Sequence, residues 1–290
     1  MQTAYYILCK PQSKSFIVCL YFLVHFTTSI GQIKIAKQDV LSKYVFKSNH
    51  IRIEGSTLAT FKARIKNETG SQKVGSSFTL GLVLGFKYSI NFSNTLSIIT
   101  GAEAMLLGKN FSTTINRTDF SPPLSNDVVK GFNSYSPDFI LSVPVVLEKR
   151  NLYAKEKYVF FSGGIRMNAS LGVDFETLSL LVTLADGSLY DLGGYDVYAN
   201  NDAKPWVSIP LNAGHAWLLK NNNLLQLSIT ANISFTKYVN GTYSIEIPGR
   251  PITQGLYSSK GSFIGLSLNY VFTNANYRIR KAYEKMNGIQ

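Results

Sequence analysis

Few side chains in this chain could carry out catalysis or hold a metal ion. Beyond residue 31 the sequence contains two histidines, His50 and His215, and no cysteine. No group of histidine, cysteine and acidic residues has the spacing of a metal site, and no His-x-Ser pairing suggests a hydrolase. His215 lies beside Trp217, where packing explains it better than catalysis does. We therefore expect no enzyme activity and no bound cofactor or metal.

Five charged residues form the most suggestive polar set: Lys62, Arg64, Lys87, Glu103 and Arg166. Each lies in a segment where apolar and polar residues alternate, and each falls on the polar side. Successive side chains of a strand point to opposite faces, so all five are predicted to face the interior of a closed sheet. Buried charges must pair or stay hydrated. We predict that Glu103 pairs with a cation of this set and helps to plug the interior; alternatively, the set lies near the open ends and is solvated.

The clearest alternating segment covers residues 225–236. Its odd positions are all apolar and its even positions are all polar and uncharged. The run is longer than an ordinary strand of about 5–6 residues and suits a tilted strand that crosses a bilayer, which needs about 9–11. This segment therefore predicts one strand of a transmembrane β-barrel.

Seven other segments show the same pattern, at about residues 56–66, 77–90, 95–107, 135–147, 158–171, 205–218 and 261–272. Their connections alternate in length: those near 91–94, 149–156 and 219–223 are short, whereas those near 108–134, 172–203 and 240–258 are long. Short turns on one side and long loops on the other are typical of transmembrane barrels. We predict an all-β, antiparallel up-and-down barrel of eight strands.

Residues 172–203 are too long for a turn and contain two β segments around Asp186-Gly187, a hairpin signal. We interpret them as a hairpin that extends two strands beyond the bilayer on the extracellular side. The alternative is an additional membrane-spanning pair, which would make ten strands.

Two predicted strands contain a proline in a similar context, Leu-Ser-Val-Pro-Val at Pro144 and Val-Ser-Ile-Pro-Leu at Pro210. Proline lacks the N–H group that a paired strand needs. We therefore expect a bulge or a local distortion at both positions.

The alternation leaves open whether the apolar face points outward to lipid or inward, as in a soluble lipocalin-type barrel. Aromatic residues near predicted strand ends favour lipid, because such residues form girdles at the two membrane interfaces. They are Tyr88, Tyr135, Tyr158, Trp206, Trp217, Tyr238, Tyr257, Tyr270 and Phe272. The opposite face is too polar for the packed core of a soluble protein.

The chain begins like an exported protein. Lys10 and Lys14 precede a short apolar run, and small residues follow it, as in a signal peptide cleaved after Gly31; the alternative is a membrane anchor. We divide the chain into a signal peptide (1–31), a periplasmic lead-in (32–52), the barrel (53–273) and a basic periplasmic tail (274–290). The formal charge of +12 comes from scattered residues, which favours contact with lipid and lipopolysaccharide over nucleic acid.

The last predicted strand carries a family resemblance. Gly265, Leu268, Tyr270 and Phe272 are spaced as in the C-terminal assembly signal of bacterial outer-membrane proteins. Residues from about 52 to 273 resemble the porin-superfamily outer membrane protein beta-barrel domains, PorT-like, of Gram-negative bacteria. The resemblance implies the outer membrane as location and the barrel-assembly machinery as a partner. Two features depart from the signal: Phe263 occupies a usually polar position, and residues 274–290 follow Phe272.

These observations favour a monomeric, non-enzymatic outer-membrane barrel that anchors or binds through its extracellular loops, with an unknown extracellular ligand or envelope protein as partner. A narrow pore or a component of an outer-membrane transport or secretion machinery is the first alternative. A soluble ligand-binding barrel and a lipid-modifying enzyme are the others.

Overall fold

The computed structural model describes residues 45–70, 72–125, 128–130, 136–154, 156–171, 175–199 and 204–274, together with Tyr277. The expected signal peptide lies outside these residues, as does the basic tail apart from Asn274 and Tyr277. None of the described helices is long and apolar enough to cross a membrane.

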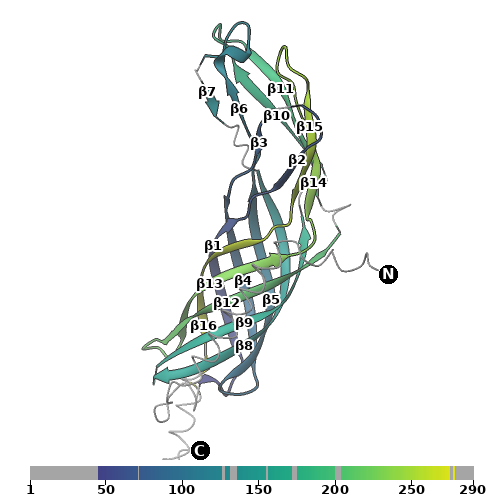
Figure 1. The fold of residues 1–290 in the computed structure, drawn as a ribbon. Helices are drawn as coiled ribbons and strands as arrows, with labels where there is room; N and C mark the ends of the chain where they lie inside the picture. Colours follow the sequence, from purple (N-terminus) through teal and green to yellow (C-terminus); the bar gives the residue numbers. More distant parts are fainter. Residues whose placement is uncertain are drawn as a thin grey trace, which may run out of the picture.

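Eight antiparallel strands close into a barrel in the order β1-β16-β13-β12-β9-β8-β5-β4 (Figure 1). In chain order they are β1 (His50–Thr60), β4 (Thr79–Asn91), β5 (Leu96–Lys109), β8 (Ser136–Ala154), β9 (Lys157–Ser170), β12 (Trp206–Leu218), β13 (Leu224–Ser234) and β16 (Phe263–Phe272). The first and last strands pair over ten positions, from Ile51 with Phe272 to Thr60 with Phe263. The predicted eight-stranded up-and-down barrel is thereby confirmed.

The two-residue period of the sequence decides which side chains face the lumen. In β13, Gln226, Ser228 and Thr230 are buried in the interior, whereas Leu227 and Ile229 are exposed on the outside. The same alternation runs through β4, where every second residue from Thr79 to Ser89 is buried.

Large apolar side chains therefore cover the outer surface of the barrel. Leu80 and Leu84 are 75% and 69% exposed, and Val145, Met167 and Leu266 are more than half exposed. A continuous apolar belt of this kind needs a nonpolar environment. The barrel is therefore of the transmembrane type, and its apolar face does not point inward as in a lipocalin.

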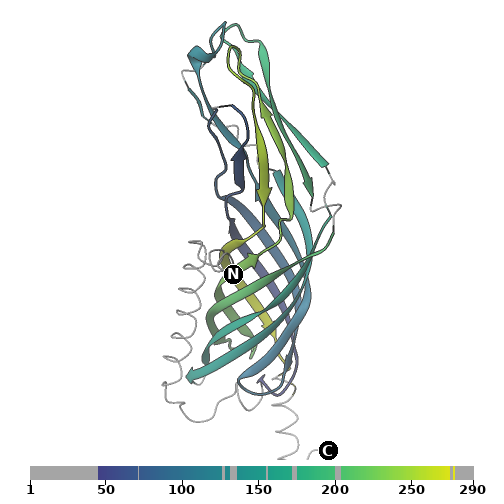
Figure 2. The same ribbon diagram turned by 45° about the vertical axis from the view of Figure 1, so that its right-hand side comes forward.

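The two ends of the barrel differ in structure. We call the end with the short connections (residues 92–95, 155–156 and 219–223) the turn end, and the opposite end the loop end. At the loop end the long connections fold into two further sheets (Figure 2). One contains β10 (Phe175–Thr183), β11 (Leu189–Ala199), β14 (Val239–Ile245), β15 (Thr253–Ser259) and β2 (Arg64–Asn67). The other contains β3 (Val74–Gly75), β6 (Ser112–Asn116) and β7 (Val128–Lys130), with a short 3-10 helix, η2 (Arg117–Asp119), between the last two.

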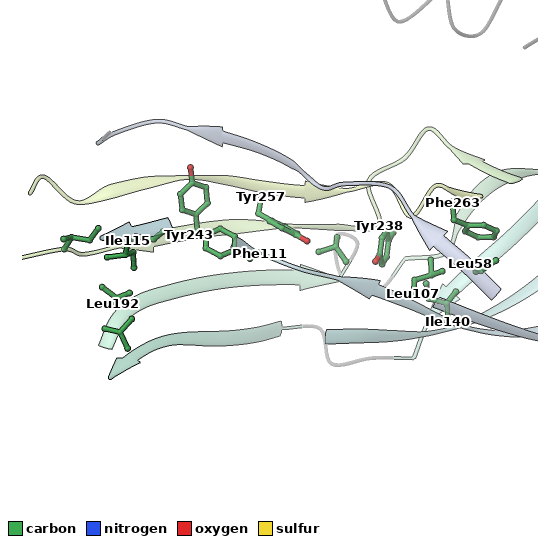
Figure 3. Packing of buried hydrophobic residues seen from close by; sticks show 14 of the residues in the cluster. Leu58, Leu107, Phe111, Ile115, Ile140, Leu192, Tyr238, Tyr243, Tyr257 and Phe263 are labelled. Carbon is green, nitrogen blue, oxygen red and sulfur yellow. The ribbon is translucent and has the colours of Figure 1, made fainter. Parts of the chain in front are cut away.

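We call these two sheets with their connections the extension. β10 and β11 pair as a hairpin outside the barrel, as expected for residues 172–203. One apolar core joins the two parts of the molecule (Figure 3). It runs from Leu58, Ile140 and Phe263 inside the barrel to Phe111 and Tyr243 inside the extension.

Several boundaries differ from the sequence-based expectation. β1 begins at His50 and ends at Thr60, although the sequence suggested a strand over 56–66 and a lead-in up to residue 52. The chain leaves the barrel after Thr60, so the next alternating residues belong to β2 of the extension.

The aromatic girdle is smaller than predicted. Tyr88 and Phe272 are exposed at the turn end, and Trp217 and Tyr270 are partly exposed there. Four other residues of the predicted girdle are buried: Tyr158, Trp206, Tyr238 and Tyr257. They occupy inward positions of their strands or lie inside the extension. Tyr135 lies outside the described residues.

The two prolines interrupt the ladder without a bulge. β5 pairs with β8 at Thr100–Val145 and at Glu103–Ser142 in one register, and the intervening pairs at Pro144 are missing. β12 and β9 show the same gap at Pro210. These registers place Gly101 opposite Pro144 and Gly164 opposite Pro210.

Candidate functional site: the charged lumen

The lumen contains a buried network of charged side chains. Its first layer lies near the turn end, where the Arg52 guanidinium donates two hydrogen bonds of 2.9 Å to the two carboxylate oxygens of Glu148. Arg150 Nε donates to Glu148 Oε1 at 2.8 Å. Paired bonds of this kind between a guanidinium and a carboxylate are among the strongest polar contacts in proteins.

This first layer crosses the barrel. Arg52 comes from β1 and Glu148 from β8, and two other strands separate β1 from β8 along the shorter way around the wall. Arg52 Nη1 also donates to Gln226 Oε1 of β13 at 3.1 Å, and the Gln226 amide donates to the Tyr158 hydroxyl of β9 at 2.8 Å. Side chains from four strands therefore meet across the interior.

The second layer is centred on Glu103 of β5. Lys87 Nζ lies 2.6 Å from Glu103 Oε1 and also contacts the Glu54 carboxylate. Arg166 Nε lies 2.8 Å from Glu103 Oε2, and the Ser142 hydroxyl donates to the same oxygen at 3.0 Å. Glu103 is 1% exposed, so it is held by two cations away from solvent.

A third layer lies at the loop end. Lys109 Nζ is 2.7 Å from Asp138 Oδ1, and the Tyr238 hydroxyl donates to Asp138 Oδ2 at 3.0 Å. Burial and the Asp138 carboxylate raise the pKa of Tyr238 well above its usual value, so the phenol keeps its proton and remains a donor. The Tyr238 ring stacks on Trp206, with ring centroids 5.4 Å apart.

An apolar cluster at the turn end closes the lumen below the first layer. Val45 and Phe46, which precede β1, are buried against Tyr158 and Phe160 of β9. The Phe46 ring meets the Tyr158 ring edge-on at 5.3 Å, and the Arg150 guanidinium carbon lies 4.3 Å from the Phe46 ring centroid. The sequence suggested a lead-in here, but not that its last residues enter the barrel.

The structure separates the five predicted lumen charges into two groups. Lys87, Glu103 and Arg166 lie in the second layer. Lys62 and Arg64 lie outside the barrel and are exposed, because β1 ends at Thr60 and the chain then turns into the extension. The Lys62 ammonium lies 5.5 Å from the Phe78 ring centroid, and Arg64 is the first residue of β2. The assignment of these two to the lumen was wrong.

Sequence reasoning missed four charges of the first two layers, Arg52, Glu54, Glu148 and Arg150, as well as Lys109 and Asp138 of the third layer. The first two fell at the edge of the expected lead-in. Glu148 fell just after the expected strand at 135–147, and Arg150 fell in the expected turn at 149–156. A signal was present in both places. Arg52 and Glu54 alternate with Ile51 and Ile53, and Glu148 and Arg150 continue the polar side of β8 after Leu147.

The residues of the predicted assembly signal lie on β16. Leu268 and Phe272 are exposed on the outer face, and the Tyr270 hydroxyl accepts hydrogen bonds from the Asn221 and Asn223 amides of the neighbouring turn. Gly265 packs against β1, where a Cβ would lie 2.2 Å from the Thr57 carbonyl oxygen.

Phe263, which departs from the signal, is buried in the lumen. The Arg166 guanidinium lies 5.7 Å from the Phe263 ring centroid. A large apolar residue at this position therefore serves the core of this barrel.

The histidines take part in local packing. His215 contacts the Tyr153 hydroxyl through Nε2, and its ring lies 4.2 Å from the Trp217 ring. His50 Nε2 lies 2.9 Å from the Val45 carbonyl oxygen. No group of three or more metal-binding side chains occurs among the described residues.

Comparisons with known proteins add a likeness in fold. No protein-family model matches the chain, and a search of curated proteins found no match. Among solved structures, the chain is similar to the outer membrane protein OprG from Pseudomonas aeruginosa, with 10% identity and a TM-score of 0.41. The alignment covers 81% of this chain and 100% of that one. A likeness at this level carries no argument about function.

Proposed function

We propose that this protein is a closed, non-enzymatic outer-membrane barrel that anchors the extension at the cell surface. The observation that carries the proposal is the lumen, where buried ion pairs fill the interior in successive layers and the Arg52–Glu148 pair crosses it from β1 to β8. An eight-stranded barrel is only wide enough for side chains to fill. Apolar clusters lie on both sides of these layers, and this arrangement supports an anchor over a pore.

The outer apolar belt and the unequal ends support the location. The three short turns lie at the turn end, where β1 begins and β16 ends. This arrangement fits a periplasmic side. The extension then lies outside the cell, next to lipopolysaccharide. The spacing of residues on β16 supports recognition by the barrel-assembly machinery and membership of the PorT-like domains.

The extension is the part that supports binding. It holds the outer part of the shared apolar core, including Phe111, Ile115, Tyr243 and Tyr257, so its outer surface is held in a defined shape. An extracellular ligand or another envelope protein would meet this surface first, and the chain acts there as a monomer.

Conductance across planar lipid bilayers tests the proposal. We expect purified protein to insert without producing a steady ion current. A steady current from the wild-type protein would contradict the closed barrel and favour the pore. Cell fractionation tests the location, and recovery in the aqueous phase without detergent would overturn the membrane assignment.

A further inference from the structure

A hollow of about 410 Å³ lies on the outside of the barrel at the turn end. Its wall is half polar and half apolar. Lys47, Ser48, Asn49 and Asn274 form the polar part, and Ile51, Tyr88 and Phe272 form the apolar part. The apolar residues belong to the outer belt, so the hollow lies at the level where the belt gives way to polar surface.

The polar part of this hollow contains a cation and an amide group that can bind a ligand. Lys47 is exposed and forms no ion pair with the part of the chain that the structure describes. The Asn49 side-chain oxygen accepts from the Asn91 N–H at 3.3 Å, which leaves the Asn49 amide NH₂ group available. A cation beside an amide donor suits a phosphate group.

A second hollow, of about 480 Å³, lies further along the outer face of the same strand. Its floor is formed by the small residues Gly55 and Thr57 of β1. Leucines form the walls on both sides, because Gly55 pairs with Leu84 and Leu268, and Thr57 pairs with Leu82 and Leu266. A Cβ added to Gly55 would meet nothing within 4 Å, so the groove is open above this residue.

The two hollows follow one line on β1, with the half-exposed Ile53 between them. From Ile51 to Thr57 a strand advances about 20 Å at about 3.3 Å per residue. With a tilt of about 40°, this becomes about 15 Å along the membrane normal. That distance is half of the bilayer's apolar core of about 30 Å, and so corresponds to one leaflet.

We propose that the outer face of β1 binds one phospholipid of the leaflet at the turn end. The phosphate contacts Lys47, with Asn49 and Asn274 as neighbouring donors. An acyl chain passes Tyr88 and Phe272 and lies over Gly55 and Thr57 between the leucines. The inference rests on the proposed membrane location. The polar pocket at one end of an apolar groove fits an amphiphile better than a second barrel, which would present an apolar surface along the whole line.

Native mass spectrometry of the full chain tests the inference, after extraction from vesicles that contain phosphatidylglycerol. We expect one retained phospholipid per barrel. Lys47→Gln removes the cation and should lower retention about tenfold, as expected for the loss of a charge-assisted contact. Gly55→Leu fills the groove and should lower retention to a similar degree.

Matched variants serve as controls. Lys157→Gln removes another exposed cation at the turn end, and Ala213→Leu places a leucine on the outer face of β12, away from both hollows. Both should retain lipid as the wild type does. Equal retention in all four variants would overturn the inference.

Two further measurements separate the possible results. Inorganic phosphate should not displace the lipid. Displacement by millimolar phosphate would show that the site binds anions only, and would contradict the binding of an acyl chain in the groove. A co-purified second copy in place of lipid would also overturn the inference. Insertion into vesicles is followed separately by the heat-dependent shift of the folded barrel on gels, so failure to insert would count against the membrane location itself.

Discussion

Single residues decide whether the buried charges of the lumen are paired. Glu148 is the partner of both Arg52 and Arg150 in the first layer, so two buried cations depend on one carboxylate. Arg150 Nη1 has no hydrogen-bond partner among the described residues, and the Phe46 ring lies against the same guanidinium. The layer has an excess of positive charge, so loss of its single anion would be costly.

Glu148→Gln tests this dependence. The substitution keeps the shape of the side chain but leaves two buried guanidinium groups without a counter-charge, and breaking a buried ion pair costs about 3–5 kcal/mol. We expect a loss of that order in the free energy of unfolding, measured by urea unfolding in lipid vesicles. Glu68→Gln is the control, because Glu68 and Lys66 form an exposed pair 3.8 Å apart, and such a pair contributes only about 0–1 kcal/mol. Equal effects of the two substitutions would contradict the importance of the first layer.

Lys62 and Arg64 mark the limit of sequence reasoning. The alternation of Lys87, Glu103 and Arg166 with apolar neighbours was enough to predict that all three face inward. The same logic failed for Lys62 and Arg64, because alternation continues past the point where β1 leaves the barrel. Nothing local distinguishes a strand of the barrel from the strand of the extension that follows it.

At the scale of elements, close contact between strands depends on glycines opposite the prolines. Pro144 and Pro210 have no N–H to offer the neighbouring strand, and the ladders are interrupted there without a change in register. A Cβ at Gly164 would lie 2.1 Å from the Val145 carbonyl oxygen, and one at Gly101 would lie 2.2 Å from the Phe86 carbonyl oxygen. The absence of a side chain at these positions keeps the wall regular.

Gly164→Ala is therefore expected to disturb the pairing of β8 and β9. A forced backbone shift of this kind costs about 1–3 kcal/mol, and we expect a lower yield of folded barrel in a heat-dependent gel-shift assay. Gly55→Ala provides the comparison, since its new methyl group would meet nothing within 4 Å. A normal yield for both variants would show that β8 can move away from β9 at no cost.

The elements also show why the barrel and the β10–β11 hairpin could be predicted and the rest of the extension could not. β13 alternates without error, because one face meets lipid and the other faces the lumen. Some strands of the extension are very short or pair with strands distant in the chain, as the four-residue β2 does with β15. Their order depends on which loops contact one another above the barrel. No periodic pattern in the sequence indicates these contacts.

At the scale of the whole molecule, the lumen is closed by successive layers. The Val45–Phe46 cluster closes the turn end, the Arg52–Glu148 layer crosses the lumen next to it, and the Glu103 layer follows. Removing one layer leaves the others in place, so a single change should not turn this barrel into a channel.

A stepwise experiment checks this redundancy. Phe46→Ala should leave the protein non-conducting in planar bilayers, because the charged layers still fill the narrow interior. Replacing Phe46, Arg52, Glu148 and Arg150 together by alanine should still give no steady current, because the Glu103 layer remains. A current from Phe46→Ala alone would show that the N-terminal cluster is the sole barrier. The Phe235→Ala variant, which changes an exposed outer residue, controls for effects of substitution itself.

The pairing of the first strand with the last has a consequence for the order of assembly. Arg52 and Glu54 lie on β1, and their partners Glu148 and Lys87 lie on strands that are made later. β1 also pairs with β16, whose residues are the last of the barrel to leave the ribosome. The sheet can therefore close into a cylinder only after β16 has been made, and we expect a truncated chain that lacks β16 to leave β1 and β13 each without one neighbouring strand.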